Sequence, residues 1–300
     1  MLEMEQLIHV DSEEDELEEL DLSDKGLECV PDCVTSCTRL VGLYLEDNSL
    51  TSLPDNIGQM KGLQEIYLRR NQIMNLPESI GELNALQCIY LENNELNEDG
   101  IPDSFGNLLS LEGLPMHNNN FTRMPTCFLN LTGLQELYFD NNKLTSLPEN
   151  FGVLTNLREL GLTNNQLSQL PKSFGALSKL EILHVEGNCL VKLPKTLSGL
   201  TALKRLYLQD NKLEKLHSCI GRCENIQVIN VENNSLRGVA KRIAELPKLK
   251  HLLLANNKLD SLPETLIAKS SNLRRFTLAG NQLASTFVSN FENLCESTNE

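Results

Sequence analysis

Residues 63–73 read LQEIYLRRNQI, one copy of the frame L-x-x-L-x-L-x-x-N-x-L, whose places we number one to eleven. The frame returns along the chain, and asparagine occupies its ninth place eleven times, at Asn48, Asn71, Asn94, Asn119, Asn142, Asn165, Asn188, Asn211, Asn234, Asn257 and Asn281. Successive copies are 23 residues apart, except for steps of 25 after Asn94 and 24 after Asn257. A fixed period of this length predicts a solenoid of stacked repeats.

Each copy joins a strand pattern to a turn pattern. Leucines alternate with variable residues around places four to six, which predicts a short strand with its leucines inward. The following segment, LPDNIGQM at residues 53–60, carries a proline that fixes the turn out of the strand. We therefore predict an α/β fold: a right-handed leucine-rich-repeat solenoid (horseshoe) of about twelve 23-residue repeats. Its concave face is a parallel sheet, and its convex face holds short 3₁₀, helical or irregular segments.

The ninth-place asparagines are assigned a structural role. Their amides can satisfy backbone donors and acceptors where the chain leaves each strand, so stacked copies are predicted to form a ladder. The frame starts first at Leu17 and last at Leu273, which predicts one domain of twelve repeats at residues 17–286. Residues 1–16 are predicted to be an acidic, partly disordered cap, and residues 287–300 a cap helix and tail.

The regular pattern breaks between the fourth and fifth repeats. Two extra residues there predict a bulged convex loop at residues 97–101, and Pro115 takes a mid-strand place. Because proline lacks the N–H that a strand donates to its neighbour, we expect locally disturbed strand pairing.

Charge and cysteine usage narrow the class of protein. The net charge is −15, and residues 1–24 hold eleven acids and no Lys or Arg, so nucleic-acid binding is not expected. No stretch approaches the roughly 18 apolar residues needed to cross a bilayer, so membrane insertion is not expected either. Nine cysteines, odd in number and scattered through the repeats, favour reduced thiols and a cytoplasmic location, with the nucleus as an alternative.

All five tyrosines fall at the fifth place of the frame: Tyr44, Tyr67, Tyr90, Tyr138 and Tyr207. The first three lie in consecutive repeats, so their rings are predicted to stand side by side on the exposed face of the sheet. Tyrosine is favoured in interfaces because it combines large area with little side-chain entropy. We predict a protein-binding surface here; a packing role between strands is the alternative.

Charged residues accompany the tyrosines. Arg69 and Arg70 can anchor a partner carboxylate, or they can neutralise Asp47 and Glu92 one strand away, and Glu92 is assigned to the same binding surface. A secondary basic patch is predicted later in the chain, with a solvated rim as the alternative; it comprises Arg205, Lys250, His251, Arg274 and Arg275.

Catalysis is not predicted. The histidines His117, His184 and His251 recur three strands apart, about 14 Å, which is too far to share a metal ion or a proton. There is no phosphate-binding loop, nucleophile elbow or kinase signature. We therefore expect no catalytic residue, no metal site and no cofactor.

The run L-x-x-L-x-x-L-x-L-x-x-N-x-L-x-x-L-P-x-x-I-G over residues 17–290 resembles the intracellular Ras-group leucine-rich-repeat proteins. That group includes the Shoc/Sur-type Ras scaffold, the Ras-suppressor protein and the repeat regions of Scribble and Erbin. The resemblance implies signal transduction, with a small GTPase, a phosphatase or another signalling protein as partner. We predict a monomeric, non-enzymatic intracellular scaffold or adaptor that binds protein through its concave face. Two alternatives stay open: a regulatory subunit of a phosphatase or GTPase, and an extracellular or cell-surface recognition protein.

Overall fold

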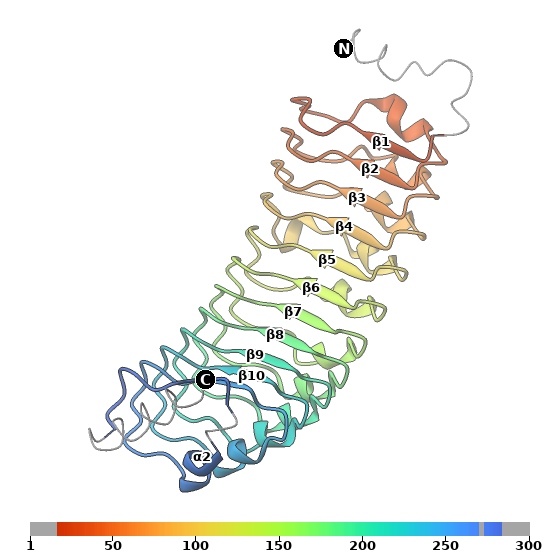
Figure 1. The fold of residues 1–300 in the computed structure, drawn as a ribbon. Coiled ribbons are helices and arrows are strands. Elements are labelled where there is room, and N and C mark those ends of the chain that lie inside the picture. The colour runs from red at the N-terminus through yellow and green to blue at the C-terminus, as the bar shows by residue number, and fades with distance from the viewer. Residues whose placement is uncertain (1–16, 270–272, 284–300) are drawn as a thin grey trace. The chain divides into compact units, whose positions relative to one another are not determined.

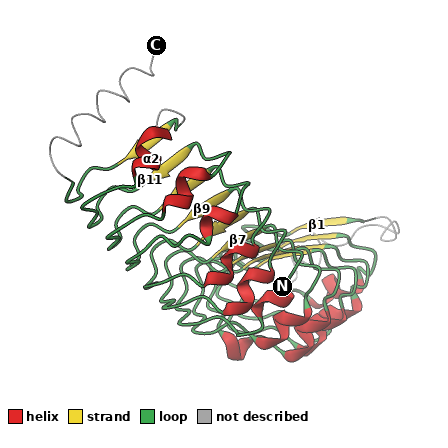
Figure 2. Cartoon of the chain, turned by 90° about the horizontal axis from the view of Figure 1, so that it is seen from below, coloured by secondary structure: helices red, strands yellow, loops and turns green. Residues whose placement is uncertain are grey.

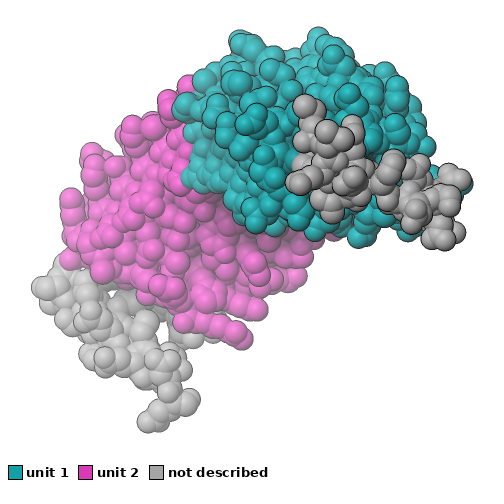
Figure 3. Space-filling view, turned by 90° about the horizontal axis from the view of Figure 1, so that it is seen from above, with its two compact units in different colours: residues 1–143 teal, residues 144–300 magenta. Residues whose placement is uncertain are grey.

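The computed structural model describes residues 17–269 and 273–283 of the chain (Figure 1). The predicted caps at residues 1–16 and 287–300 lie outside the described residues and stay predictions. The chain divides into two compact units, residues 1–143 and residues 144–300, coloured separately in Figure 3.

The described part of the first unit contains six strands of three residues each. They are β1 (Glu19–Asp21), β2 (Gly42–Tyr44), β3 (Glu65–Tyr67), β4 (Cys88–Tyr90), β5 (Gly113–Pro115) and β6 (Glu136–Tyr138). Each strand covers places three to five of the frame. Parallel pairing in register sets Glu65 opposite both Gly42 and Cys88, so residues at one place of the frame form a row across the strands.

The described part of the second unit repeats this arrangement. Its strands are β7 (Glu159–Gly161), β8 (Ile182–His184), β9 (Arg205–Tyr207), β10 (Val228–Asn230), β11 (His251–Leu253) and β12 (Arg275–Thr277). They pair in parallel and in chain order, with Leu183 opposite Leu206 and Leu252 opposite Phe276. The leucine-rich-repeat fold predicted from the frame is confirmed.

Short helices, red in Figure 2, return the chain between strands. In the first unit they are the 3₁₀ helices η2 (Asp32–Ser36), η3 (Ile57–Gln59), η4 (Glu78–Glu82), η5 (Glu98–Gly100), η6 (Asp103–Asn107) and η7 (Thr126–Asn130). In the second they are η8 (Phe151–Val153), η9 (Lys172–Ala176), η10 (Lys195–Gly199), η11 (Ile220–Arg222), η12 (Lys241–Glu245) and the α-helix α2 (Glu264–Lys269).

The turn residues account for this geometry. Pro77 holds an extended backbone (φ −73°, ψ 154°) immediately before η4, and Ile80 within η4 is fully buried. A side chain at Gly81 would come within 2.1 Å of the Ser104 carbonyl oxygen in the next repeat. At position 81 only glycine therefore permits η4 and η6 to pack this closely.

The predicted asparagine ladder is confirmed. Asn71, which is buried, accepts from the Leu50 N–H at 3.0 Å through Oδ1. Its Nδ2 donates to the carbonyl oxygens of Leu45 at 2.9 Å and Leu68 at 3.0 Å. Each such amide satisfies three backbone groups in two repeats, which explains why the residue recurs at this place.

A second row, at the eighth place of the frame, adopts positive φ. It contains Asp24, Asp47, Arg70, Asn93, Asn118, Asn141, Asn164, Gly187, Asp210, Asn233, Asn256 and Gly280. All of these except Arg70 are Asn, Asp or Gly, the residues that tolerate the left-handed region best. The frame alone did not predict a left-handed backbone at the eighth place. The predominance of Asn, Asp and Gly in this row could have indicated it.

The break in the pattern takes the predicted place. Between β4 and β5 only Cys88 and Gly113 form a register pair, whereas three pairs join β3 to β4. Pro115 has no N–H to donate there, so the expected disturbance of pairing is confirmed. The extra residues at 97–101 form the 3₁₀ turn η5, whose Asp99 and Gly100 N–H groups donate to Asn97 Oδ1.

Candidate protein-binding surface

The rings of Tyr44, Tyr67 and Tyr90, which we call the tyrosine stack, lie face to face on β2, β3 and β4. Ring centroids are 4.6 Å apart between Tyr44 and Tyr67 and 4.3 Å apart between Tyr67 and Tyr90, with interplanar angles of 13° and 8°. The predicted side-by-side arrangement is confirmed. The rings are half-buried rather than fully exposed, because each covers the face of the next.

Each ring leans back toward the third place of its own strand. Tyr67 Oη donates to Glu65 Oε2 at 2.7 Å. A Cβ added at Gly42 would lie 3.3 Å from the Tyr44 ring. The absence of a side chain at Gly42 therefore leaves the space that the Tyr44 ring occupies. The stack therefore presents ring edges outward and a line of hydroxyl groups over the third-place row.

The surroundings keep these hydroxyls protonated. Burial and the hydrogen bond to Glu65 raise the pKa of Tyr67. The hydrogen bond between the Cys88 thiol and the Tyr90 hydroxyl, together with burial, raises the pKa of Tyr90 to about 12. Burial raises the pKa of Cys88 to about 11. At neutral pH the stack is thus a set of uncharged hydrogen-bonding groups.

Beside the stack, the seventh-place residues Glu46, Arg69 and Glu92 form what we call the charged row. Arg69 Nη2 donates to Glu46 Oε1 at 3.1 Å. Glu92 is only 8% exposed. Arg69 and Glu92 were both predicted to be at the binding surface. The structure buries Glu92 and pairs Arg69 with Glu46 of the preceding repeat, while 41% of the Arg69 side chain stays exposed.

The Arg70 guanidinium pairs with the Asp47 carboxylate through two nitrogens. Of the two roles considered for Arg70, this contact favours neutralisation of Asp47. The Arg70 side chain remains about half exposed, so part of it can still contact a partner.

The other two tyrosines lie apart from the stack. Tyr138 on β6 is opposite Pro115, which separates it from Tyr90. Tyr207 on β9 stacks on His184, with centroids 4.6 Å apart and an interplanar angle of 13°. His184 Nδ1 contacts Glu186 Oε1 at 3.1 Å. Sequence reasoning missed this His–Tyr pair, although both residues occupy the fifth place in adjacent repeats.

The predicted basic patch is spread over several strands of the second unit. His251 is opposite Arg275 and half-buried, while Arg205, Arg274 and Arg275 are exposed. Val228 of β10 lies between Arg205 and His251. Lys250, half-buried, donates its backbone N–H to Gln227. Arg205 is thus separated by one strand from the other members of the patch.

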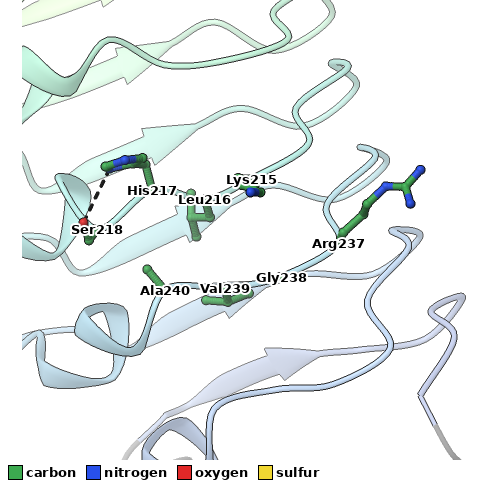
Figure 4. A pocket seen from close by; sticks show the side chains of 8 residues that line it. All are labelled: Lys215, Leu216, His217, Ser218, Arg237, Gly238, Val239 and Ala240. Atoms are coloured by element: carbon green, nitrogen blue, oxygen red, sulfur yellow. Dashed lines mark hydrogen bonds between the residues drawn. The ribbon is translucent and has the colours of Figure 1, made fainter.

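A shallow pocket of about 360 Å³ occurs in the second unit where His217 and Ala240 replace the turn proline (Figure 4). Gly238 adds to it, since a Cβ there would meet no atom within 4 Å. Its cationic side chains do not converge: Arg237 points away from the pocket, and His217 Nδ1 accepts from the Cys219 N–H at 3.3 Å. The tyrosine stack is the better organised surface.

No group of three or more His, Cys, Asp or Glu within residues 17–269 and 273–283 is arranged to hold a metal ion. The eight cysteines in this part of the chain are free thiols, and Cys295 lies outside it. A helix long and apolar enough to cross a bilayer does not occur in the described part either.

The comparisons with known proteins agree with the fold. A family model described as a leucine-rich repeat region matches residues 66–161 and 140–278. The chain therefore belongs to the leucine-rich-repeat family, whose fold serves binding and recognition and is generally non-enzymatic. No match was found among curated proteins.

Several solved structures are similar to the chain. The Leptospira interrogans leucine-rich-repeat protein LIC12759 is 28% identical, with a TM-score of 0.67 over 94% of this chain and 83% of its own. The plant peptide hormone receptor RGFR1, solved in complex with RGF2, is 32% identical, with a TM-score of 0.77. That match covers 90% of this chain but 45% of the receptor chain. The Listeria monocytogenes internalin InlF, at 20% identity and a TM-score of 0.82 over 94% of this chain and 79% of its own, supports the fold alone.

Proposed function

We propose that this chain is a non-enzymatic intracellular scaffold or adaptor that binds a protein partner through the outward face of β2, β3 and β4. The tyrosine stack is the observation that carries the proposal. Three half-buried rings, already aligned by contact with one another, lose little entropy on binding and offer both apolar edges and hydroxyl groups. The RGFR1 structure supports protein or peptide binding as the use of such a repeat surface.

A reducing intracellular location and a signalling partner belong to the same proposal. Eight free thiols in the described residues support a compartment that keeps cysteine reduced. The resemblance of the 23-residue frame to the Ras-group proteins supports a small GTPase, a phosphatase or a related signalling protein as the partner of a monomeric scaffold. Treating intact cells that make this protein with a thiol-alkylating reagent tests whether the chain lies in a reducing compartment. The exposed Cys29 thiol is expected to be labelled rapidly. An oxidised Cys29 would contradict the proposed location.

A comparative affinity purification tests the binding surface. The wild-type chain and the triple variant Tyr44→Ala/Tyr67→Ala/Tyr90→Ala are used as baits, and the captured proteins are quantified by mass spectrometry. The control bait is Leu109→Ala/Val153→Ala/Val191→Ala, which trims exposed apolar side chains away from the stack. Proteins lost with the tyrosine variant and kept with the control support the proposal. Equal recovery with all three folded baits refutes it.

A further inference from the structure

The outward-facing places of the first unit carry an excess of negative charge. Places three, five and seven hold one arginine, Arg69, one histidine, His117, and seven carboxylates: Glu19, Asp21, Glu46, Glu65, Glu92, Glu136 and Asp140. The same places of the second unit hold three carboxylates, two arginines and two histidines: Glu159, Glu186, Glu232, Arg205, Arg275, His184 and His251. The strong acidic bias is therefore a property of the face that holds the tyrosine stack.

Within residues 17–269 and 273–283, much of this charge is left without an ion pair. Glu46 is paired with Arg69, but Glu19, Glu65, Glu92 and Glu136 enter no ion pair with the described residues. Two buried oxygens, Glu46 Oε2 and Glu92 Oε2, accept no hydrogen bond in the same part of the chain. These two oxygens are closed to solvent, whereas Glu19 and Glu136 are exposed and Glu65 is half-buried. The Glu19, Glu65 and Glu136 carboxylates can therefore accept from a donor outside the chain.

The charge concentrates around one end of the stack. In the third-place row, Gly42 lies between Glu19 and Glu65. The Glu19 side chain passes 3.5 Å from the position that a Cβ of Gly42 would take, and the Tyr44 ring lies over the same glycine. Burial and the carboxylates of Glu19, Glu65 and Glu46 raise the pKa of Tyr44. Glu19 and Glu65 thus lie on either side of the glycine over which the Tyr44 hydroxyl is placed.

We propose that this place binds an arginine side chain from an extended, basic segment of the protein partner. The guanidinium lies between the Glu19 and Glu65 carboxylates, two strand spacings or about 9.6 Å apart at the backbone, and donates to them and to Tyr44 Oη. A planar group with five N–H donors suits two carboxylates better than an ammonium does. Its methylene stem lies along the ring edges of the stack. The inference rests on the proposed function and adds the chemistry of the partner.

Fluorescence anisotropy with a defined peptide tests the inference. The probe is fluorescein-labelled Gly-Ser-Arg-Gly-Ser-Arg-Gly-Ser, and its neutral counterpart carries citrulline in place of arginine. The full chain is expected to bind the arginine peptide, more weakly at higher salt, and not the citrulline peptide. Glu19→Gln/Glu65→Gln is expected to weaken binding about tenfold, and Tyr44→Phe about threefold, since it removes one acceptor and keeps the ring.

The matched control is Glu95→Gln/Glu149→Gln, which removes the same charge from exposed positions elsewhere on the surface. An equal loss of affinity in this control means that the peptide follows net charge only and overturns the inference. Equal binding of the citrulline peptide overturns it as well. A dimer in sedimentation velocity that Glu19→Gln/Glu65→Gln dissociates also overturns it, because the occupant is then a second copy of the chain.

The two proposals fail in distinguishable ways. The tyrosine triple variant can lose captured proteins while Glu19→Gln/Glu65→Gln binds the arginine peptide as tightly as the wild type. That result supports the proposed binding function and refutes the arginine site. When the triple variant captures the same proteins as wild type, the proposed function falls whatever the peptide does.

Discussion

Arg70 and Asp47 occupy the same place in adjacent repeats, both with positive φ (54° and 57°), and their side chains form a two-point ion pair. Arginine is unusual in this conformation: the other members of the eighth-place row are Asn, Asp or Gly. The pairing with Asp47 orders the Arg70 side chain, whose backbone conformation is strained for a residue of this type.

Replacing Arg70 by asparagine is expected to stabilise the fold by roughly 0.5–1 kcal/mol. Asn233 in the same place donates to Asp210 at 2.8 Å, so Arg70→Asn relieves strain and can retain a hydrogen bond to Asp47. Urea titration gives the change in midpoint. Arg69→Asn is the control, because Arg69 is not among the positive-φ residues. If the urea midpoint of Arg70→Asn is no higher than that of the wild type and of Arg69→Asn, the left-handed backbone at Arg70 does not destabilise the fold.

Tyr67 is expected to contribute more to stability than either neighbour in the stack. It contacts two rings, whereas Tyr44 and Tyr90 each have one ring contact within the stack. With about 0.5–1.5 kcal/mol per aromatic pair, Tyr67→Ala should cost about one pair more than Tyr44→Ala. Thermal unfolding followed by near-ultraviolet circular dichroism measures both the stability and the loss of ring coupling. Equal costs for the two variants would show that stacking adds nothing beyond burial.

Stability is expected to fall at alkaline pH. The folded-state pKa values of Cys88 (about 11) and Tyr90 (about 12) lie above their ordinary values of 9.0 and 10.0. For acids with raised pKa values, the stabilisation is complete below the unfolded pKa and is lost as pH rises through the folded pKa. Urea midpoints should therefore decline from about pH 9 upward.

The variant Cys88→Ala/Tyr90→Phe removes both titrations and should show a shallower decline. Part of the decline should remain, since burial also raises the pKa of Cys127 to about 11 and of Cys223 to about 12. An identical pH profile for this variant and the wild type argues against the assignment to Cys88 and Tyr90.

The asparagine ladder is expected to be costly to interrupt. Asn71→Ala strands the Leu50 N–H and removes a donor from the carbonyl oxygens of Leu45 and Leu68. At about 1–3 kcal/mol for a buried unsatisfied group, we expect a loss of roughly 3 kcal/mol. Gln72→Ala, at the exposed neighbouring position, should change stability by less than about 0.5 kcal/mol. Similar losses of unfolding free energy in the two variants would show that the asparagine ladder does not contribute to stability.

Much of the site follows from the repeat, but its contacts do not. The frame places Tyr44, Tyr67 and Tyr90 in one row, and their stacking confirms that register. The burial of Glu92 and the choice of Glu46 as the partner of Arg69 could not be read from spacing. Neighbours on strands about 4.8 Å apart compete for the same space, and the outcome depends on the packing of whole side chains.

The sequence by itself determined the architecture of this protein, because a 23-residue period ties every leucine and asparagine to one place in a repeated strand and turn. The same period determined which residues share a row and therefore where the tyrosines gather. Only the tertiary structure decided what each row does: the left-handed backbone at Arg70, the lean of Tyr44 over Gly42, and the position of the Glu19 side chain beside the same glycine. The Arg70–Asp47 and Glu19–Gly42 contacts join residues 23 positions apart, and the Tyr44 ring stacks on Tyr67 of the next repeat, so these features exist only once the repeats have stacked.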